Sequence, residues 1–201
     1  MTDDRQTDET RRDGPAEWPV SVSGVTESIV TTLGPNDLWN AAALGLHAGD
    51  PVTARTWGNT RTRRNFHRQG EGYVQFVDDP VAVADAALSI VESEEPILES
   101  AAAWARVTVE RIDAGTEGET DWEAWALRPV ESSVVRETIP TIDRGFGAVV
   151  EATVAASRLE VADYDEADLR DRLADCAAVV ERAGGPRERE ALERVREHST
   201  W

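Results

Sequence analysis

Apolar and polar residues alternate along much of the first two thirds of the chain, a pattern that is typical of β-strands. In residues 25–33, for example, Val25, Ile29 and Leu33 share one face and hydroxyl side chains the other, which predicts a half-buried strand. The last two strands are predicted to pair as a hairpin, with residues 113–120 as its loop. Six segments are predicted as strands: residues 25–33, 38–46, 52–57, 71–77, 104–112 and 121–130.

Capping residues and apolar residues spaced three or four apart predict five helices. Asn59 or Thr60 caps the first helix, and Asp79 caps the second. Cys176 lies in the apolar stripe of the fourth helix, so we expect it to be buried. The helices are predicted at residues 60–68, 80–91, 144–159, 165–183 and from residue 186 onward.

These elements suggest a chain of three parts. Residues 1–19 lack apolar periodicity and are predicted to be a disordered leader, although Trp18 could dock on the body. Residues 20–140 contain the strands and are predicted to form a small barrel domain with a crossover helix. Residues 141–201 are predicted to be a C-terminal helical segment packed on the barrel.

The charge balance narrows the setting in which the protein works. The chain has 39 acidic and 21 basic residues, a formal net charge of −18, and every basic residue is arginine. Such a chain stays soluble at high salt, where self-repulsion is screened, so its composition indicates a halophilic source. It would repel a long polyanion, which disfavours nucleic-acid binding. Without a signal-peptide pattern or an apolar run of about 20 residues, we expect a cytoplasmic protein.

One stretch reverses this charge. No acidic residue lies between Asp50 and Glu71, but five arginines and a histidine do. The stretch also reads as a strand, a turn at Gly58 and the start of a helix, and the N–H groups and dipole of a helix N-terminus attract anions. We therefore predict a phosphate site here; the alternative is a solvated basic helix face.

Small side chains dominate the second predicted strand, where Ala41, Ala42, Ala43 and Gly45 follow one another closely. Alanine is a poor strand former, and small residues on a strand mark a place where another object approaches closely. That object is either a flat ligand or a packed helix.

Three segments in this order resemble an archaeal family of FMN-binding split-barrel proteins of unknown function: ESIVTTLGPNDLWNAAALGL, ARTWGNTRTRRNF and GYVQFVDDP. The flavin-reductase split barrels are similar more distantly. The resemblance covers residues 25–88 well and is one of layout beyond residue 97. It implies a mainly β plus α fold, in which a six-stranded split β-barrel carries a crossover helix and C-terminal helices. It also implies non-covalent FMN and a homodimer with the flavin near the interface.

Carried over by motif, two sets of residues would contact FMN. The phosphate and ribityl chain would be surrounded by Arg55, Thr56, Asn59, Thr60, Thr62 and Asn65. The isoalloxazine would lie against Thr32, Asn40, Ala41 and Ala42. The residue types agree with this assignment, because guanidinium, hydroxyl and amide groups hold phosphate and small side chains let a flat ring approach. Neither GxGxxG nor GxxxxGKS occurs, which disfavours a dinucleotide fold or a P-loop.

The resemblance implies a flavin-dependent oxidoreductase whose substrate and electron donor the sequence does not identify. Because a flavin carries its own chemistry, no catalytic side chain is assigned. The alternatives are a non-enzymatic flavin-binding or sensing module, and a split barrel that uses deazaflavin or haem. The three histidines lack the spacing of metal ligands, so no metal is expected, and neither a membrane nor a nucleic acid is expected as a partner.

Overall fold

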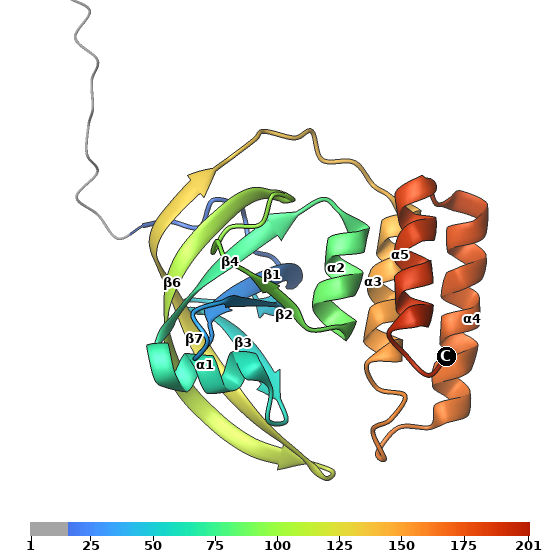
Figure 1. Cartoon of the computed structure of the whole chain (residues 1–201), viewed down its shortest axis with the longest axis horizontal. Coiled ribbons are helices and arrows are strands. Elements are labelled where there is room, and N and C mark those ends of the chain that lie inside the picture. The colour runs from blue at the N-terminus through green and yellow to red at the C-terminus, as the bar shows by residue number, and fades with distance from the viewer. Residues whose placement is uncertain (1–15) are drawn as a thin grey trace, which may run out of the picture.

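The computed structural model describes residues 16–201, which form seven strands and five helices (Figure 1). The strands are β1 (Val25–Leu33), β2 (Trp39–His47), β3 (Val52–Trp57), β4 (Glu71–Val77), β5 (Val91–Ser93), β6 (Ala101–Glu117) and β7 (Thr120–Val134). The helices are α1 (Arg61–Gln69), α2 (Pro80–Leu88), α3 (Arg144–Ala156), α4 (Glu166–Ala183) and α5 (Pro186–Glu197). Most of the predicted disordered leader, residues 1–15, lies outside the described residues.

Six of the strands close into an antiparallel barrel, as predicted. They follow the order β1–β4–β6–β7–β3–β2, and pairing of β2 with β1 completes the ring. Val30, Leu46, Val74 and Trp125 belong to the buried cluster inside it. Ahead of β1, Trp18 docks on this cluster, with its ring 6.3 Å from that of Phe76.

β1 is buried on both faces, so the half-buried strand predicted there is wrong. All of residues 28–32 are buried. Val30 faces the barrel interior, whereas Ile29 packs on the outside against α2. A hydroxyl can be buried where it finds an acceptor, and Ser28 Oγ donates to the carbonyl oxygen of Leu44 at 2.6 Å.

β6 and β7 continue as a long two-stranded arm, so the loop predicted at residues 113–120 is also wrong. β6 runs to Glu117, and the turn before β7 takes two residues. Gly115 was predicted to lie in the loop, but it lies in β6 and lets the ring of Trp122 pack against the strand. A Cβ at this position would lie 2.7 Å from Cζ2 of Trp122. The tip of the arm reaches towards the segment between α3 and α4 (Figure 1).

The helices begin where their caps predict. The side chains of Thr60, Asp79 and Asp165 each accept a hydrogen bond from a backbone N–H in the first turn of α1, α2 and α4. Helix α2 ends at Leu88 and does not extend to residue 91 as predicted. Val91 instead belongs to β5, a short strand that pairs with β2.

The helices α3, α4 and α5 pack with α2 on one side of the barrel (Figure 1). Val81 of α2 shares a buried cluster with Val149, Leu173 and Leu192. The prediction that Cys176 is buried is wrong: it is only half-buried at the margin of this cluster, and the next residue takes the interior position. Within residues 16–201, no helix combines the length and apolar character needed to cross a membrane.

Candidate functional site

The N-terminus of α1 begins with an exposed cap residue, Thr60, and an exposed first residue, Arg61. Thr60 caps the helix by accepting from the N–H of Arg63 at 3.3 Å. The first turn of α1, all of which is described, contains no acidic residue. The N–H groups of Arg61 and Thr62 have no acceptor among residues 16–201. Unsatisfied N–H groups and the positive end of the helix dipole suit this site to an anion.

Arg63, in the first turn of α1, is held by a buried carboxylate. Arg63 binds Glu123 of β7 through both oxygens, each at 3.0 Å. Glu123 is 2% exposed and is also contacted by His67 at 2.7 Å and Arg111 at 3.2 Å. Burial alone would raise the pKa of Glu123, but these three hydrogen-bonding partners outweigh it and hold the pKa below its usual value.

This carboxylate changes the meaning of the acid-free stretch, because an acid from a distant strand pairs with Arg63 and contacts His67. Arg63 Nη1 also donates to the carbonyl oxygen of Gly58 at 3.1 Å, in the turn before α1. The ion pair therefore fixes both α1 and the turn that leads into it.

The other arginines of the stretch differ in what they contact. Arg61 pairs with Glu92 of β5 at 2.6 Å, and Arg68 donates to Asn65 Oδ1 at 2.8 Å. Arg64 donates to the carbonyl oxygen of Asn59 at 2.6 Å, and Arg55 lies 4.5 Å above the ring of Trp122. Because Arg55, Arg64 and Arg68 contact neutral groups, their charges remain available to an anion.

Four of the predicted site residues gather under α1, out of reach of solvent. Thr32, Asn40, Thr62 and Asn65 are 0%, 5%, 4% and 3% exposed. Asn65 Nδ2 donates to Thr32 Oγ1 at 2.9 Å, and Thr32 pairs with Asn40 across β1 and β2. The hydrogen bonds between Asn65 and Thr32 hold α1 on the barrel.

Of the six remaining predicted residues, Ala42 is half-buried on β2, and the other five fall into two groups. Arg55, Asn59 and Thr60 are exposed on the outer side of the barrel. Thr56 points inward and accepts from Trp125 Nε1 at 2.9 Å, while Ala41 packs against α2. At Ala41, the close neighbour predicted from the small side chain is a helix.

The strands β2 and β3 separate beside α1. They pair only at Leu46–Ala54 and His47–Thr53, and β5 pairs with the other end of β2. Between these ladders, residues 42–45 of β2 pair only with β1, and residues 55–57 of β3 pair only with β7. We name these two facing edges the β2–β3 split.

The α1 N-terminus stands at the wide end of the split, because Arg61 reaches Glu92 on β5, the strand that takes over the edge of β2. Every second residue along these edges directs its backbone N–H and C=O groups away from the strand with which it pairs, so these groups are available to the polar edge of a ligand. Ala42 and Gly45 add little side-chain bulk beside these groups.

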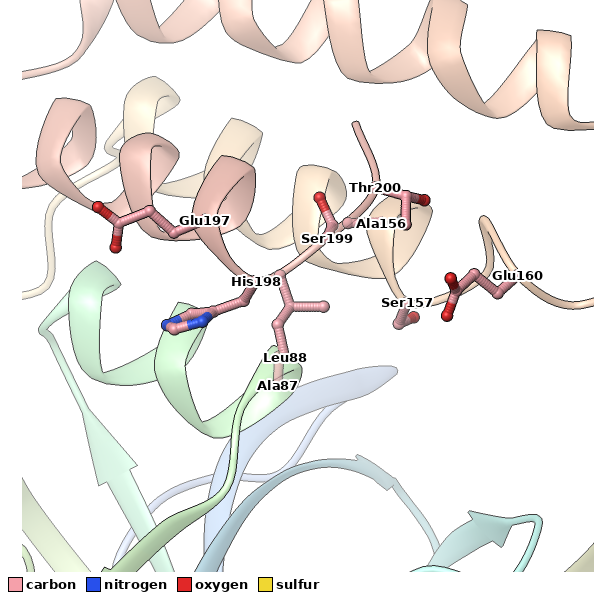
Figure 2. A pocket seen from close by; sticks show the side chains of 9 residues that line it. All are labelled: Ala87, Leu88, Ala156, Ser157, Glu160, Glu197, His198, Ser199 and Thr200. Carbon is pink, nitrogen blue, oxygen red and sulfur yellow. The ribbon is translucent and has the colours of Figure 1, made fainter.

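Of the cavities near the helical side of the molecule, two are relevant to the site. One, of about 480 Å³, is lined by the ends of α2, α3 and α5, but its polar groups do not converge: Glu160 lies opposite Glu197 and His198 (Figure 2). The other, of about 430 Å³, includes Trp57 and Thr60 and so adjoins the N-terminus of α1.

Comparison with known proteins places the chain in a family. The model for the N-terminal domain of a protein of unknown function, DUF447, matches residues 26–136, and a second DUF447 model matches residues 143–197. The chain belongs to the DUF447 family.

A solved structure of an FMN-bound DUF447 protein from Methanosarcina mazei has a TM-score of 0.76 to this chain at 22% identity, covering 88% of this chain and 96% of that one. The two share a fold. Component B of nitrilotriacetate monooxygenase from Bacillus cereus has a TM-score of 0.41 at 19% identity, covering 56% and 70%. An FMN-binding protein from Thermus thermophilus with bound p-hydroxybenzaldehyde has a TM-score of 0.38 at 16% identity, covering 63% and 80%.

Sequence reasoning missed Glu123, the residue that organises the arginine stretch. A signal for it exists: period two puts Glu123 on the same strand face as Trp125 and Leu127, which are core residues. An acid on an apolar face needs a partner, and the arginine stretch is where partners are most concentrated.

Proposed function

We propose that this DUF447 protein binds FMN non-covalently at the β2–β3 split. The observation that carries the proposal is that two unpaired strand edges open beside a helix N-terminus that has free N–H groups and no acid. The split offers polar backbone groups to a flat ring, and the helix offers a phosphate site. FMN requires both in one place. The FMN-bound relative of the same fold supports this choice of ligand.

The phosphate binds at the start of α1 in this proposal. The N–H groups of Arg61 and Thr62, the hydroxyl of Thr60 and the amide of Asn59 would hold it, with the charges of Arg55 and Arg64 nearby. The ring lies along β2 beside Ala42. Thr32, Asn40, Thr56 and Asn65 act from below, by holding α1 and the strands in place, because their side chains are buried.

Bound FMN would supply one- or two-electron redox chemistry, and we propose an oxidoreductase. The protein's own part is to hold the cofactor beside an opening through which a small substrate can reach it. A flavin-storing or sensing role would use the same site without turnover.

We further propose a homodimer with the flavin near the interface. An outward-facing row of half-buried aromatic rings on the barrel supports it: Trp39 lies 5.4 Å from Tyr73, and Tyr73 lies 5.7 Å from Trp104. Aromatic side chains are enriched in protein interfaces. We also propose a cytoplasmic protein of a halophilic archaeon, on the strength of the net charge of −18 without lysine.

The visible spectrum of the purified protein, together with mass identification of any bound molecule, tests the cofactor. We expect a flavin spectrum, or its appearance after FMN is added at high salt. A protein that stays colourless and takes up no FMN contradicts the proposal. A deazaflavin or haem spectrum would show that the bound ligand is that flat molecule and not FMN. Oxidation of NADH or NADPH by the holo-protein would separate an enzyme from a binding module.

A further inference from the structure

The cavity of about 430 Å³ beside the α1 N-terminus is built by three separate parts of the chain. The end of β3 contributes Trp57, and the β6–β7 arm contributes Glu117 and Thr120. The segment between α3 and α4 contributes the opposite wall, which includes Arg158 and Tyr164. Its volume lies within the range of roughly 300–1,000 Å³ that is usual for small-molecule sites.

The walls of this cavity carry aromatic rings that are open to solvent. Trp57 is 41% exposed and Tyr164 is 42% exposed, although both are large and partly apolar. They come from opposite sides, one from the barrel and one from the helical segment. Exposed aromatic faces that line one cavity suit a flat aromatic ligand, because stacking removes both from water.

The cavity also holds a positioned cation. The Arg158 guanidinium lies 5.1 Å from the centre of the Tyr164 ring. Among the described residues that line the cavity, Arg158 is the one cationic side chain, and the acids are Glu117 of the arm and Asp163 of the α3–α4 segment. The Asp163 carboxylate is already engaged, because Oδ2 accepts from the N–H of Glu119 at 3.0 Å.

That hydrogen bond joins the arm to the α3–α4 segment at a position that requires glycine. Gly118 has a φ of 59°, and a Cβ there would lie 1.7 Å from Asp163 Oδ2. The arm and the segment therefore meet closely across the cavity, which fixes the distance between the wall of β3 and the wall that carries Tyr164.

We propose that this cavity is a second ligand site, for a planar aromatic molecule that carries one carboxylate or similar anionic group. The ring stacks on Trp57 and Tyr164, and the anion pairs with Arg158. The site adjoins the proposed phosphate position, because Thr60 belongs to both. It meets the β2–β3 split at Trp57, the last residue of the β3 edge, whereas the wall that carries Tyr164 lies outside the split. It would place a small molecule next to the cofactor.

Calorimetric titration of the full chain with 2-naphthoate and with its neutral analogue 2-naphthamide tests this site. We expect 2-naphthoate to bind roughly tenfold more tightly than 2-naphthamide, because of its charge-assisted contact with Arg158. Arg158→Gln should bring the two affinities within about twofold of each other. Trp57→Leu should weaken both ligands by roughly tenfold.

Arg182→Gln is the matched control, because Arg182 is an exposed arginine in the last turn of α4 and lies outside the cavity lining. It should leave both affinities unchanged. The proposal would be overturned if Arg182→Gln and Arg158→Gln changed the affinity for 2-naphthoate equally. It would also be overturned if Trp57→Leu left that affinity unchanged.

The titration is repeated after saturation with FMN. An unchanged affinity for 2-naphthoate supports a second site. Competition between FMN and 2-naphthoate would overturn it, because the cavity would then be the place of the flavin ring. Failure of FMN to bind would contradict the proposed function alone, since the naphthoate titration of the apo-protein does not depend on it.

Discussion

At the scale of single residues, Glu123 is the acid that holds the arginine stretch in place. It is a buried acid bound by three basic side chains from α1 and β6. Two of these, His67 and Arg111, are about half exposed, so water screens them, and Arg63 is the partner that depends most on the carboxylate. Removing one member of a buried pair leaves the other without compensation.

Glu123→Gln should therefore lower the free energy of unfolding by roughly 3 kcal/mol, because it leaves the Arg63 guanidinium without its counter-charge. Urea unfolding at constant salt measures the change. Glu131→Gln serves as the control: Glu131 pairs with Arg106 on the surface, and its loss should cost less than about 1 kcal/mol. Equal losses in the two variants would contradict this prediction, because the buried Glu123 would then contribute no more than a surface acid.

The same residue predicts how stability depends on pH. The pKa of Glu123 is lowered in the folded protein, so the unfolded chain takes up the proton first as pH falls. Its contribution is complete above the unfolded pKa of about 4.3 and is lost as pH drops through the folded value. The stability difference between wild type and Glu123→Gln should thus be constant near neutrality and shrink in acid. A difference that grows on acidification would contradict this sign.

At the scale of elements, α1 links the barrel to the proposed cofactor. Thr60 has two roles that can be separated: its side chain caps the helix, and its position lies where the phosphate would bind. Aspartate caps a helix as well as threonine does, but it places a negative charge at the same point.

Thr60→Asp should preserve thermal stability and weaken FMN binding by at least roughly tenfold, through repulsion of the phosphate. Thr60→Ser, which keeps the cap and stays neutral, should leave both nearly unchanged. Differential scanning calorimetry and FMN titration measure the two effects. An undiminished FMN affinity in Thr60→Asp would mean that the phosphate does not bind at the N-terminus of α1.

Local signals in the sequence predicted the elements well, because a cap or turn depends on adjacent residues. Thr60, Asp79 and Asp165 begin helices for that reason. Long-range pairing was not predictable in the same way. Arg63 meets an acid 60 positions away, and β1 is buried on its outer face by a helix that follows much later in the chain. The contacts of the predicted site residues with FMN stay a prediction, although the buried position of Asn65 shows that its removal would act through the fold.

At the scale of the whole molecule, the net charge of −18 dominates. Several arginines are neutralised in ion pairs, so most of the remaining surface charge is unbalanced and repels itself. Salt screens this repulsion, with a Debye length that falls from about 10 Å at 0.1 M to about 3 Å at 1 M.

The thermal unfolding midpoint should therefore rise as KCl increases from about 0.1 M to about 1 M, because the Debye length falls over this range to about 3 Å. Chloride is the suitable anion, because sulfate would also strengthen apolar burial. A midpoint that falls with KCl would mean that the surface ion pairs outweigh the self-repulsion.

The relative affinity for FMN and riboflavin, measured by titration of the apo-protein at high salt, tests the central claim most directly. The two ligands differ only in the phosphate. If the phosphate binds at the N-terminus of α1, FMN should bind at least roughly tenfold more tightly than riboflavin. Equal affinities, or no binding of either, would contradict the proposed site.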